Sequence, residues 1–166
     1  MIRAAAPAVL SMALAACAGT SLQEHYPPAP VAASASAVLP PADPRAVMVD
    51  LATSMIGQPY RFGGAAPGGF DCSGLVAYAA NGAGIRVART AREQLRAGKP
   101  VARGDLKAGD LVFMHLAHKE LHVGIAVGGE RFVHAPAAGG HVRIDSLAAP
   151  PYSKSFLRAL RIIAAQ

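Results

Sequence analysis

The stretch of residues 122–135 constrains the fold more than any other part of the chain. Val123, Ile125 and Val127 alternate there with small or polar residues, and Gly128-Gly129-Glu130 separates this run from a second short one. Alternation with a period of two is typical of a strand with one buried face, and two such runs around a glycine turn form a hairpin. We therefore expect an antiparallel sheet, because a hairpin joins antiparallel strands.

The length of the hairpin turn decides which side chains share a face. A three-residue turn would pair Val127 with Arg131 and leave His122 and His134 on one face, as diagonal neighbours with α-carbons roughly 7–8 Å apart. A two-residue turn would shift the register by one and place the two histidines on opposite faces. The apolar residues favour the three-residue turn, because it gathers them on the other face.

The first half of the domain has helical spacing instead. Asp43 and Pro44 suit the start of a helix, and the run from Met48 to Met55 repeats apolar residues at i, i+3, i+4 and i+7. Two more helices are predicted over residues 71–80 and 90–97. Further strands are predicted at residues 111–114, 131–135 and around 142–144, while 156–163 fits either type. Helices followed by strands indicate an α+β domain over residues 43–166, with the helices packed on an antiparallel sheet.

The residues before this domain have a different character. Residues 1–16 hold an early arginine and a short apolar run, which is typical of an export signal, and small residues lead up to Cys17 as in lipoprotein signals. We expect cleavage before Cys17 and acylation of that cysteine; an ordinary signal peptide is the alternative. Residues 17–42 would then form a tether rich in Pro, Ala and Ser. By analogy with such lipoproteins, a residue other than Asp after the cysteine, here Ala18, points to anchoring in the outer-membrane lipid, with the domain facing the periplasm.

Charge and cysteine count limit the partners. The formal net charge is +6, but the basic residues are dispersed and no aromatic residues are interleaved with them. Nucleic acid is therefore not expected as a partner, whereas a wall polymer or an anionic membrane surface suits the charge equally well. Because Cys17 and Cys72 have separate expected roles, we predict no disulfide between them. We also expect the protein to be a monomer.

Cys72 is the candidate nucleophile. It stands at the start of its predicted helix, where free backbone N–H groups and the helix dipole would lower the pKa of the thiol. A small core residue is the alternative, since Cys72 shares helical spacing with Leu75, Val76 and Ala79. The two histidines of the hairpin favour catalysis, with His122 as base and a second ring to orient it.

Several segments resemble the NlpC family of papain-like cell-wall peptidases. These are residues 61–64 (Arg-Phe-Gly-Gly) and 70–76 (Phe-Asp-Cys-Ser-Gly-Leu-Val), followed by 109–113, 122–125 and 132–135 in the order that the family has them. Residues 89–94 and 142–145 are also similar to family sequence. The resemblance runs from about residue 45 to 163, is strongest to murein endopeptidase lipoproteins of Gram-negative bacteria, and implies a papain-like fold with a strand as the final segment.

The resemblance also implies roles for individual residues. Cys72 would be the nucleophile, His122 the base and His134 the third catalytic residue, while Tyr60 lines the site. Asp71 and Ser73, on either side of the cysteine, are expected to bind substrate. Many members have Ser directly before the base, where this chain has Leu121, so the substrate pocket is expected to differ.

The implied substrate is the stem peptide of peptidoglycan. The lipoprotein form and the absence of a wall-binding repeat favour cleavage of the D-alanyl–diaminopimelyl cross-link; the γ-D-glutamyl–diaminopimelyl bond is the alternative. A non-catalytic wall-binding lipoprotein and a related acyltransferase or amidase are the competing hypotheses.

A metal site is not expected. His115, His118 and His122 are close in sequence, but zinc needs three or four convergent ligands, and the His-Glu-x-x-His arrangement is missing. We therefore predict neither a metal ion nor another cofactor.

Overall fold

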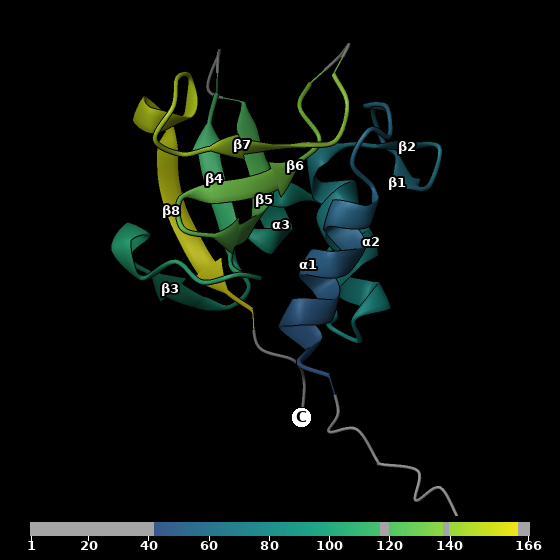
Figure 1. The fold of residues 1–166 in the computed structure, drawn as a ribbon, viewed down its shortest axis with the longest axis horizontal. Coiled ribbons are helices and arrows are strands. Elements are labelled where there is room, and N and C mark those ends of the chain that lie inside the picture. The colour runs from purple at the N-terminus through teal and green to yellow at the C-terminus, as the bar shows by residue number, and fades with distance from the viewer. Residues whose placement is uncertain (1–41, 117–119, 138–139, 163–166) are drawn as a thin grey trace, which may run out of the picture. The chain divides into compact units, whose positions relative to one another are not determined.

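The structure, a computed structural model, describes residues 42–116, 120–137 and 140–162 (Figure 1). The predicted export signal, the acylated Cys17 and the tether lie outside the described residues. No helix in the described ranges is long and apolar enough to cross a membrane.

Local sequence explains where the helices begin. Helix α1 spans Pro44–Ser54, and the side chain of Asp43 caps it by accepting from the backbone N–H of Arg45 at 3.0 Å. Helix α2 spans Cys72–Gly82, and the short α3 spans Ala91–Gln94 behind a capping box made by Thr90 and Glu93. The first two helices confirm the prediction, whereas α3 ends earlier than the predicted residue 97.

An antiparallel sheet of six strands carries the second half of the chain, in the order β3-β8-β4-β5-β6-β7. Its strands are β3 (Lys99–Val101), β4 (Leu111–His115), β5 (Leu121–Gly128), β6 (Arg131–His134), β7 (Arg143–Ser146) and β8 (Phe156–Arg161). The final segment is thus a strand, as the family resemblance implied. Strand β3 has no alternating pattern and was not predicted, nor was the small hairpin of β1 (Ala65–Ala66) and β2 (Gly69–Phe70). Two 3-10 turns, at Arg103–Asp105 and Tyr152–Lys154, complete the described elements.

The β5–β6 hairpin corrects the predicted turn. Gly128 pairs with Arg131, so the turn has two residues, and Val127 is an extra residue between that pair and the next one, Ala126 with Phe132. The predicted pairing of Val127 with Arg131 is therefore wrong. A bulge of one residue restores the register that a two-residue turn would have shifted. The histidine end of the hairpin keeps the predicted phase.

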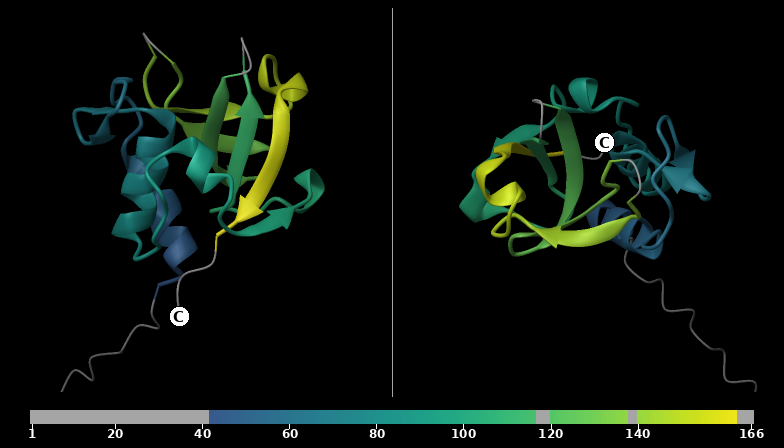
Figure 2. Two further views of the ribbon diagram at one scale, coloured as in Figure 1. Left: turned by 180° about the vertical axis from the view of Figure 1, so that it is seen from behind. Right: turned by 90° about the horizontal axis from the view of Figure 1, so that it is seen from above.

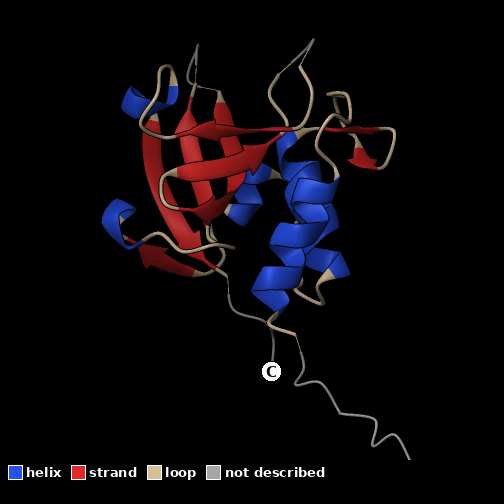
Figure 3. Cartoon of the chain, in the orientation of Figure 1, coloured by secondary structure: helices blue, strands red, loops and turns tan. Residues whose placement is uncertain are grey.

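The helices cover one face of the sheet. Figures 2 and 3 show α1 and α2 together on one side of the strands, seen from opposite directions. Residues of α1 and α2 are buried there with alternate residues of the sheet: Met48, Ala52, Leu75, Val76, Leu111, Phe113, Val123, Ile125 and Val133. The other alternate residues form a second apolar cluster, with Val112, Met114, Ala126, Phe132 and Ala159. Period-two strands buried on both faces explain why both sets are apolar.

One buried carboxylate ties the helix layer to the sheet. Asp110 is fully buried and accepts from Arg45 of α1 at 2.7 Å, from Arg161 of β8 at 2.9 and 2.8 Å, and from the backbone N–H of Lys107 at 2.9 Å. Both oxygens are satisfied, which a buried charge requires. This cluster fixes α1 against the strands, and α2 packs on α1.

Candidate active site

Cys72 is the first residue of α2 and carries a free thiol. The helix starts there because Asp71 caps it: Oδ1 of Asp71 accepts from the backbone N–H of Gly74 at 2.6 Å and from the hydroxyl of Ser73 at 3.1 Å. The predicted position of the cysteine at a helix N-terminus is confirmed. The thiol is only partly exposed and packs against the core beneath the helix.

Asp71 also holds the preceding glycine loop. Its Oδ2 accepts from the backbone N–H of Gly63 at 3.0 Å, and Arg89 donates to its two oxygens at 3.0 and 2.7 Å. Arg89 also donates to the carbonyl of Gly64 at 3.2 Å. Gly74 of the helix approaches that carbonyl so closely that a Cβ at position 74 would collide with it. The carboxylate, the arginine and the glycine therefore position the loop against the start of α2.

Asp71 and Ser73 were predicted to bind substrate. The hydrogen bonds of Asp71 lie within the protein, and Ser73 is 7% exposed with its hydroxyl donating to Asp71. These contacts show how both side chains shape the start of the helix. Arg89 lies in a segment that resembles the family, but the sequence predicts no role for it, although its guanidinium faces the carboxylate of Asp71.

The thiol environment differs from the expectation. Burial raises the pKa of Cys72, and the charges of Asp71 and Glu120 raise it further, while the backbone N–H groups of Val123 and Ser73 lower it in part. The net direction is upward, so the prediction of a lowered pKa is wrong. Two carboxylates and the loss of water outweigh the backbone amides, an outcome that the position of the cysteine in a helix cannot reveal.

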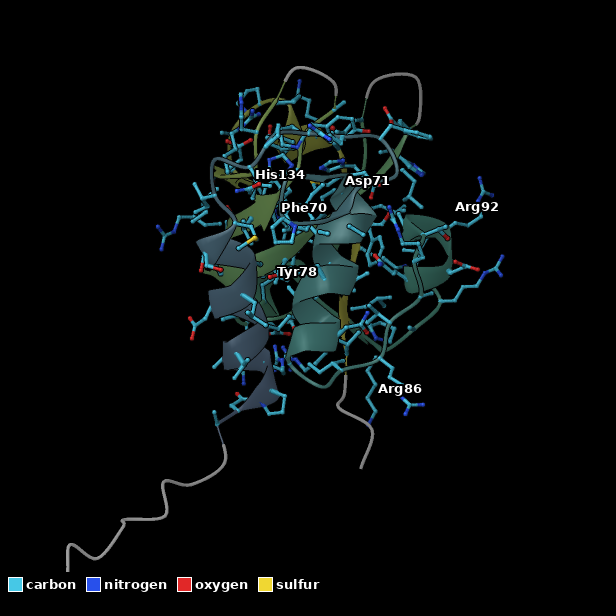
Figure 4. The ribbon with its side chains drawn as sticks, turned by 90° about the vertical axis from the view of Figure 1, so that its right-hand side faces the viewer. Phe70, Asp71, Tyr78, Arg86, Arg92 and His134 are labelled. Carbon is cyan, nitrogen blue, oxygen red and sulfur yellow. The ribbon has the colours of Figure 1, made fainter. Side chains whose placement is uncertain are left out.

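The thiol of Cys72 lies beside the strand that carries the candidate base. The backbone N–H of Val123 is close enough to the sulfur to lower the pKa of Cys72, and Val123 directly follows His122 on β5, so Cys72 lies beside the strand segment that carries the predicted base. Nε2 of His122 is 2.7 Å from Nδ1 of His134, and the two rings meet edge to face with centroids 5.0 Å apart. The sequence prediction that these histidines share a face and touch is confirmed. Figure 4 shows Asp71 at the start of α2 and His134 on the strands next to that helix.

Both histidines are buried and uncharged at neutral pH. Burial is the main cause that lowers the pKa of His122 from 6.5 to about 3, and repulsion from His134, once that ring is protonated, and from the Arg143 cation adds to it. Burial also lowers the pKa of His134 to about 4, although the carboxylate of Asp145 opposes this shift. A neutral imidazole can accept a proton, which a general base must do.

The polar chain continues beyond the predicted residues. Nε2 of His134 is 2.9 Å from Oδ2 of Asp145, and the same oxygen accepts from the hydroxyl of Tyr152 at 2.8 Å and from Nε of Arg143 at 2.9 Å. None of these three was predicted as a site residue. The one signal in the sequence is a charged pair, Arg143 and Asp145, that alternates on a strand after the second histidine.

Tyr60 lies near the nucleophile. Burial raises the pKa of its hydroxyl, and the charges of Cys72, Asp71 and Glu120 raise it further, so the phenol is within electrostatic reach of all three. Its backbone is held by a bridge to Phe70 in the glycine hairpin.

The remaining histidines do not assemble a metal centre in the described ranges. No group of three His, Cys, Asp or Glu side chains with the geometry to hold an ion is found in the described part of the chain. His118 lies outside the described residues, while His115 is exposed at the end of β4 and His141 is exposed beside Pro59.

A cavity of about 420 Å³ opens beside α2. It shares Arg89 with the polar cluster at the helix start, but Cys72, His122 and His134 are not in its lining, so it is a separate hollow. Its lining consists of Ala65, Ala77, Tyr78, Asn81, Gly82, Val87 and Arg89.

Comparison with protein families gives a match to the NlpC/P60 family over residues 57–161. The chain is 42% identical over 114 residues to "Murein DD-endopeptidase MepH" of Escherichia coli K12, covering 65% of this chain and 42% of that protein. It is 38% identical over 111 residues to "Gamma-D-glutamyl-L-lysine dipeptidyl-peptidase" of Bacillus subtilis 168, covering 64% and 37%. The chain thus spans less than half the length of these relatives.

A solved structure agrees with the fold. The protein described as similar to lipoprotein, NLP/P60 family, from Staphylococcus aureus Mu50 has a TM-score of 0.65 and 34% identity, covering 72% of this chain and 41% of that chain. The predicted α+β class and the resemblance read from the motifs around Cys72 and His122 are both confirmed.

Proposed function

The chain belongs to the NlpC/P60 family, and on that premise we propose that it is a cysteine peptidase that hydrolyses a peptide bond in the stem peptides of peptidoglycan. The observation that carries the proposal is the row of groups from Cys72 to His122 and His134. The sulfur lies beside the strand of the first histidine, and the second histidine contacts the first at 2.7 Å. This is the order of nucleophile, base and orienting group.

The reaction follows from these positions. His122 takes the proton of Cys72 as the sulfur attacks the carbonyl carbon of the peptide bond. The protonated imidazole then gives that proton to the leaving amine, the carbon–nitrogen bond breaks, and an acyl-enzyme remains. Water, deprotonated by His122, attacks the thioester and releases the new carboxylate and the free thiol. His134 holds the ring of His122 throughout.

The resting site stores this proton on sulfur. The pKa of Cys72 is raised and that of His122 is lowered, so the thiol and the imidazole are both neutral at neutral pH. Cys72 and His122 therefore do not form an ion pair before substrate binds, and the proton passes from the thiol to the imidazole once substrate is bound. The backbone N–H groups of Ser73 and Val123 stabilise the thiolate as it forms.

For the scissile bond, we propose the D-alanyl–diaminopimelyl cross-link. The relative named a murein DD-endopeptidase, at 42% identity, supports this choice. The γ-D-glutamyl–diaminopimelyl bond is the second candidate, supported by the relative named a gamma-D-glutamyl-L-lysine dipeptidyl-peptidase. Leu121, which stands directly before the base where many family members have Ser, is the position at which we expect the substrate pocket to differ.

We further propose that Cys17 is acylated and anchors the protein in the outer membrane, with the domain in the periplasm. Support comes from the sequence alone: a short apolar run, small residues and then a cysteine, followed by the Pro-rich segment. The peptidase domain would then act on the adjacent wall as a monomer.

Digestion of purified muropeptides tests the function. The full chain and its Cys72→Ala and Cys17→Ala variants are incubated with cross-linked dimers and with uncross-linked monomers, and the products are identified by mass spectrometry. We expect dimers to become monomers with the wild type and with Cys17→Ala, the matched cysteine control, and no products with Cys72→Ala.

The alternatives leave different products or none. Shortened monomers would indicate the γ-D-glutamyl bond, and binding without products would indicate a non-catalytic wall-binding protein. Iodoacetamide should abolish hydrolysis by alkylating Cys72, and EDTA should leave it unchanged. Inhibition by EDTA that zinc reverses, with iodoacetamide harmless, would point to a metallopeptidase.

A further inference from the structure

The polar chain that starts at His122 ends on the carboxylate of Asp145, and we propose that Asp145 is a positioning residue that selects Nδ1 of His122 as the base. The proposal rests on the peptidase function above and adds a group that acts through His134 without contacting the reacting atoms. Its geometry is complete within the described residues.

The first step concerns the proton on His134. Oδ2 of Asp145 meets three partners: Nε2 of His134 at 2.9 Å, the hydroxyl of Tyr152 at 2.8 Å and Nε of Arg143 at 2.9 Å. Burial raises the pKa of Asp145, but the hydrogen bonds from these three groups outweigh it and hold the pKa below its ordinary range. An ionised carboxylate can only accept, so Nε2 of His134 must carry a hydrogen and donate it.

The second step transfers this choice to His122. His134 is neutral, because its pKa is lowered to about 4, so its other nitrogen, Nδ1, has no hydrogen and accepts. Nδ1 of His134 is 2.7 Å from Nε2 of His122, which must therefore be the donor. His122 is also neutral, and its remaining nitrogen, Nδ1, keeps a free electron pair. That pair is the one available to the thiol of Cys72.

The fold holds the rings so that only the placement of protons is left to the carboxylate. Asp145 lies on β7 directly opposite Phe132 of β6. Asp145 is therefore a diagonal neighbour of His134 on the same face of the sheet. The fully buried ring of His134 meets the ring of Tyr152 edge to face at 5.4 Å, and that of His122 at 5.0 Å. These ring contacts and the hydrogen bonds at 2.7 and 2.9 Å hold the two rings in place, so the network has two proton arrangements and one geometry.

Two variants separate this role from a structural one. In Asp145→Asn the amide oxygen would take the position of Oδ2, because three donors converge there, and both histidines would keep hydrogen on Nε2. In Asp145→Leu the acceptor is gone while the Tyr152 hydroxyl and Arg143 still donate, so Nε2 of His134 becomes the acceptor. Both tautomers then invert, and His122 presents a hydrogen instead of an electron pair to the thiol.

The experiment combines nitrogen NMR of the imidazole rings with steady-state kinetics on the full chain. We expect hydrogen on Nε2 of His122 and His134 in the wild type and in Asp145→Asn, and on Nδ1 of both in Asp145→Leu. We expect kcat to fall about a hundredfold in the Leu variant, the lower end of what acid–base catalysis contributes, with KM little changed. Asp145→Asn should restore most of that loss. Asp50→Asn, at an exposed carboxylate on α1, is the matched control and should resemble the wild type in both measurements.

Each outcome decides the matter. Hydrogen on Nδ1 of either histidine in the wild type would overturn the proposal without any variant. Equal loss of kcat in the Asn and Leu variants, or wild-type activity in the Leu variant, would overturn it as well. If Asp145→Leu does not fold, the resonances of the wild type and of Asp145→Asn still decide. If the wild type hydrolyses no muropeptide, the proposed function fails, whereas the resonances test the tautomers independently.

Discussion

Replacement of Asp71 by Asn should make the nucleophile easier to ionise and the protein easier to unfold. Asp71 is the residue before Cys72, and its charge is one of the causes that raise the pKa of the thiol. An amide of the same shape removes that charge and leaves Arg89, a cation, beside the helix start. Both changes favour the thiolate, so the pKa of Cys72 should fall.

The cost to stability follows from five hydrogen bonds. Oδ1 of Asp71 accepts from Gly74, Ser73 and Arg89, and Oδ2 accepts from Gly63 and Arg89. An Asn with its oxygen at the Oδ1 position keeps the helix cap but turns an NH₂ group toward the two donors at Oδ2. The lost bond to Gly63 costs about 1 kcal/mol, and the lost charge opposite Arg89 adds about 1 kcal/mol or less, because the arginine side chain is 39% exposed. Asp71→Ala also removes the cap, which costs about 1 kcal/mol more.

Alkylation by iodoacetamide measures the thiol without requiring turnover, and urea unfolding measures stability. For the full chain with Asp71→Asn, we expect the alkylation rate to rise at lower pH than in the wild type and the free energy of unfolding to drop by about 2 kcal/mol. Asp50→Asn controls for a general change of charge. An alkylation profile that stays in place or moves to higher pH would refute the account of the thiol environment.

Three further predictions follow from the structure. Protonation of His122, whose pKa is lowered to about 3, removes the base, and loss of the Cys72 proton, whose pKa is raised, removes the acid. We therefore expect kcat/KM to stay constant from well below pH 6.5 to above the ordinary pKa of a thiol. A fall in kcat/KM on the acid side near pH 6.5 would contradict this. Asp110→Asn should lower the free energy of unfolding in urea by about 3 kcal/mol, because it breaks a buried cluster of charges, whereas Glu130→Gln at an exposed ion pair should cost less than about 1 kcal/mol; equal costs would show that burial does not matter here. Cys17→Ala should move the protein from the membrane fraction to the soluble periplasmic fraction, and a variant still found with membranes would place the anchor elsewhere.

Sequence patterns predicted the parts of the fold that depend on near neighbours. The cap at Asp43 and the alternation around Val123 are local, and they gave α1 and the two-histidine face. Strand β3 was missed because Lys99–Val101 has no alternation and includes a proline; its partner, β8, lies some sixty residues away along the chain. A short strand of this kind is defined by its partner rather than by its own residues.

Other parts of the site could not be predicted from the sequence. The contact of Asp145 with His134 depends on the register between β6 and β7, which no local pattern of the sequence reveals. The pKa of Cys72 depends on how deeply α2 packs and on which carboxylates face the sulfur. Position at a helix start favours the thiolate, but burial is a property of the assembled core, and in this site it dominates.

The bulge at Val127 separates the length of the hairpin tip from the alignment of the histidines. Because the extra residue sits between the Gly128–Arg131 and Ala126–Phe132 pairs, its deletion would leave both pairs opposite one another in an unbroken ladder. Deletion of Val127 would thus remove the bulge and leave the residue pairs on either side of it unchanged. The hairpin therefore tolerates the loss of one residue near its turn. Such a change, natural or engineered, would leave His122 and His134 aligned at the other end of the two strands.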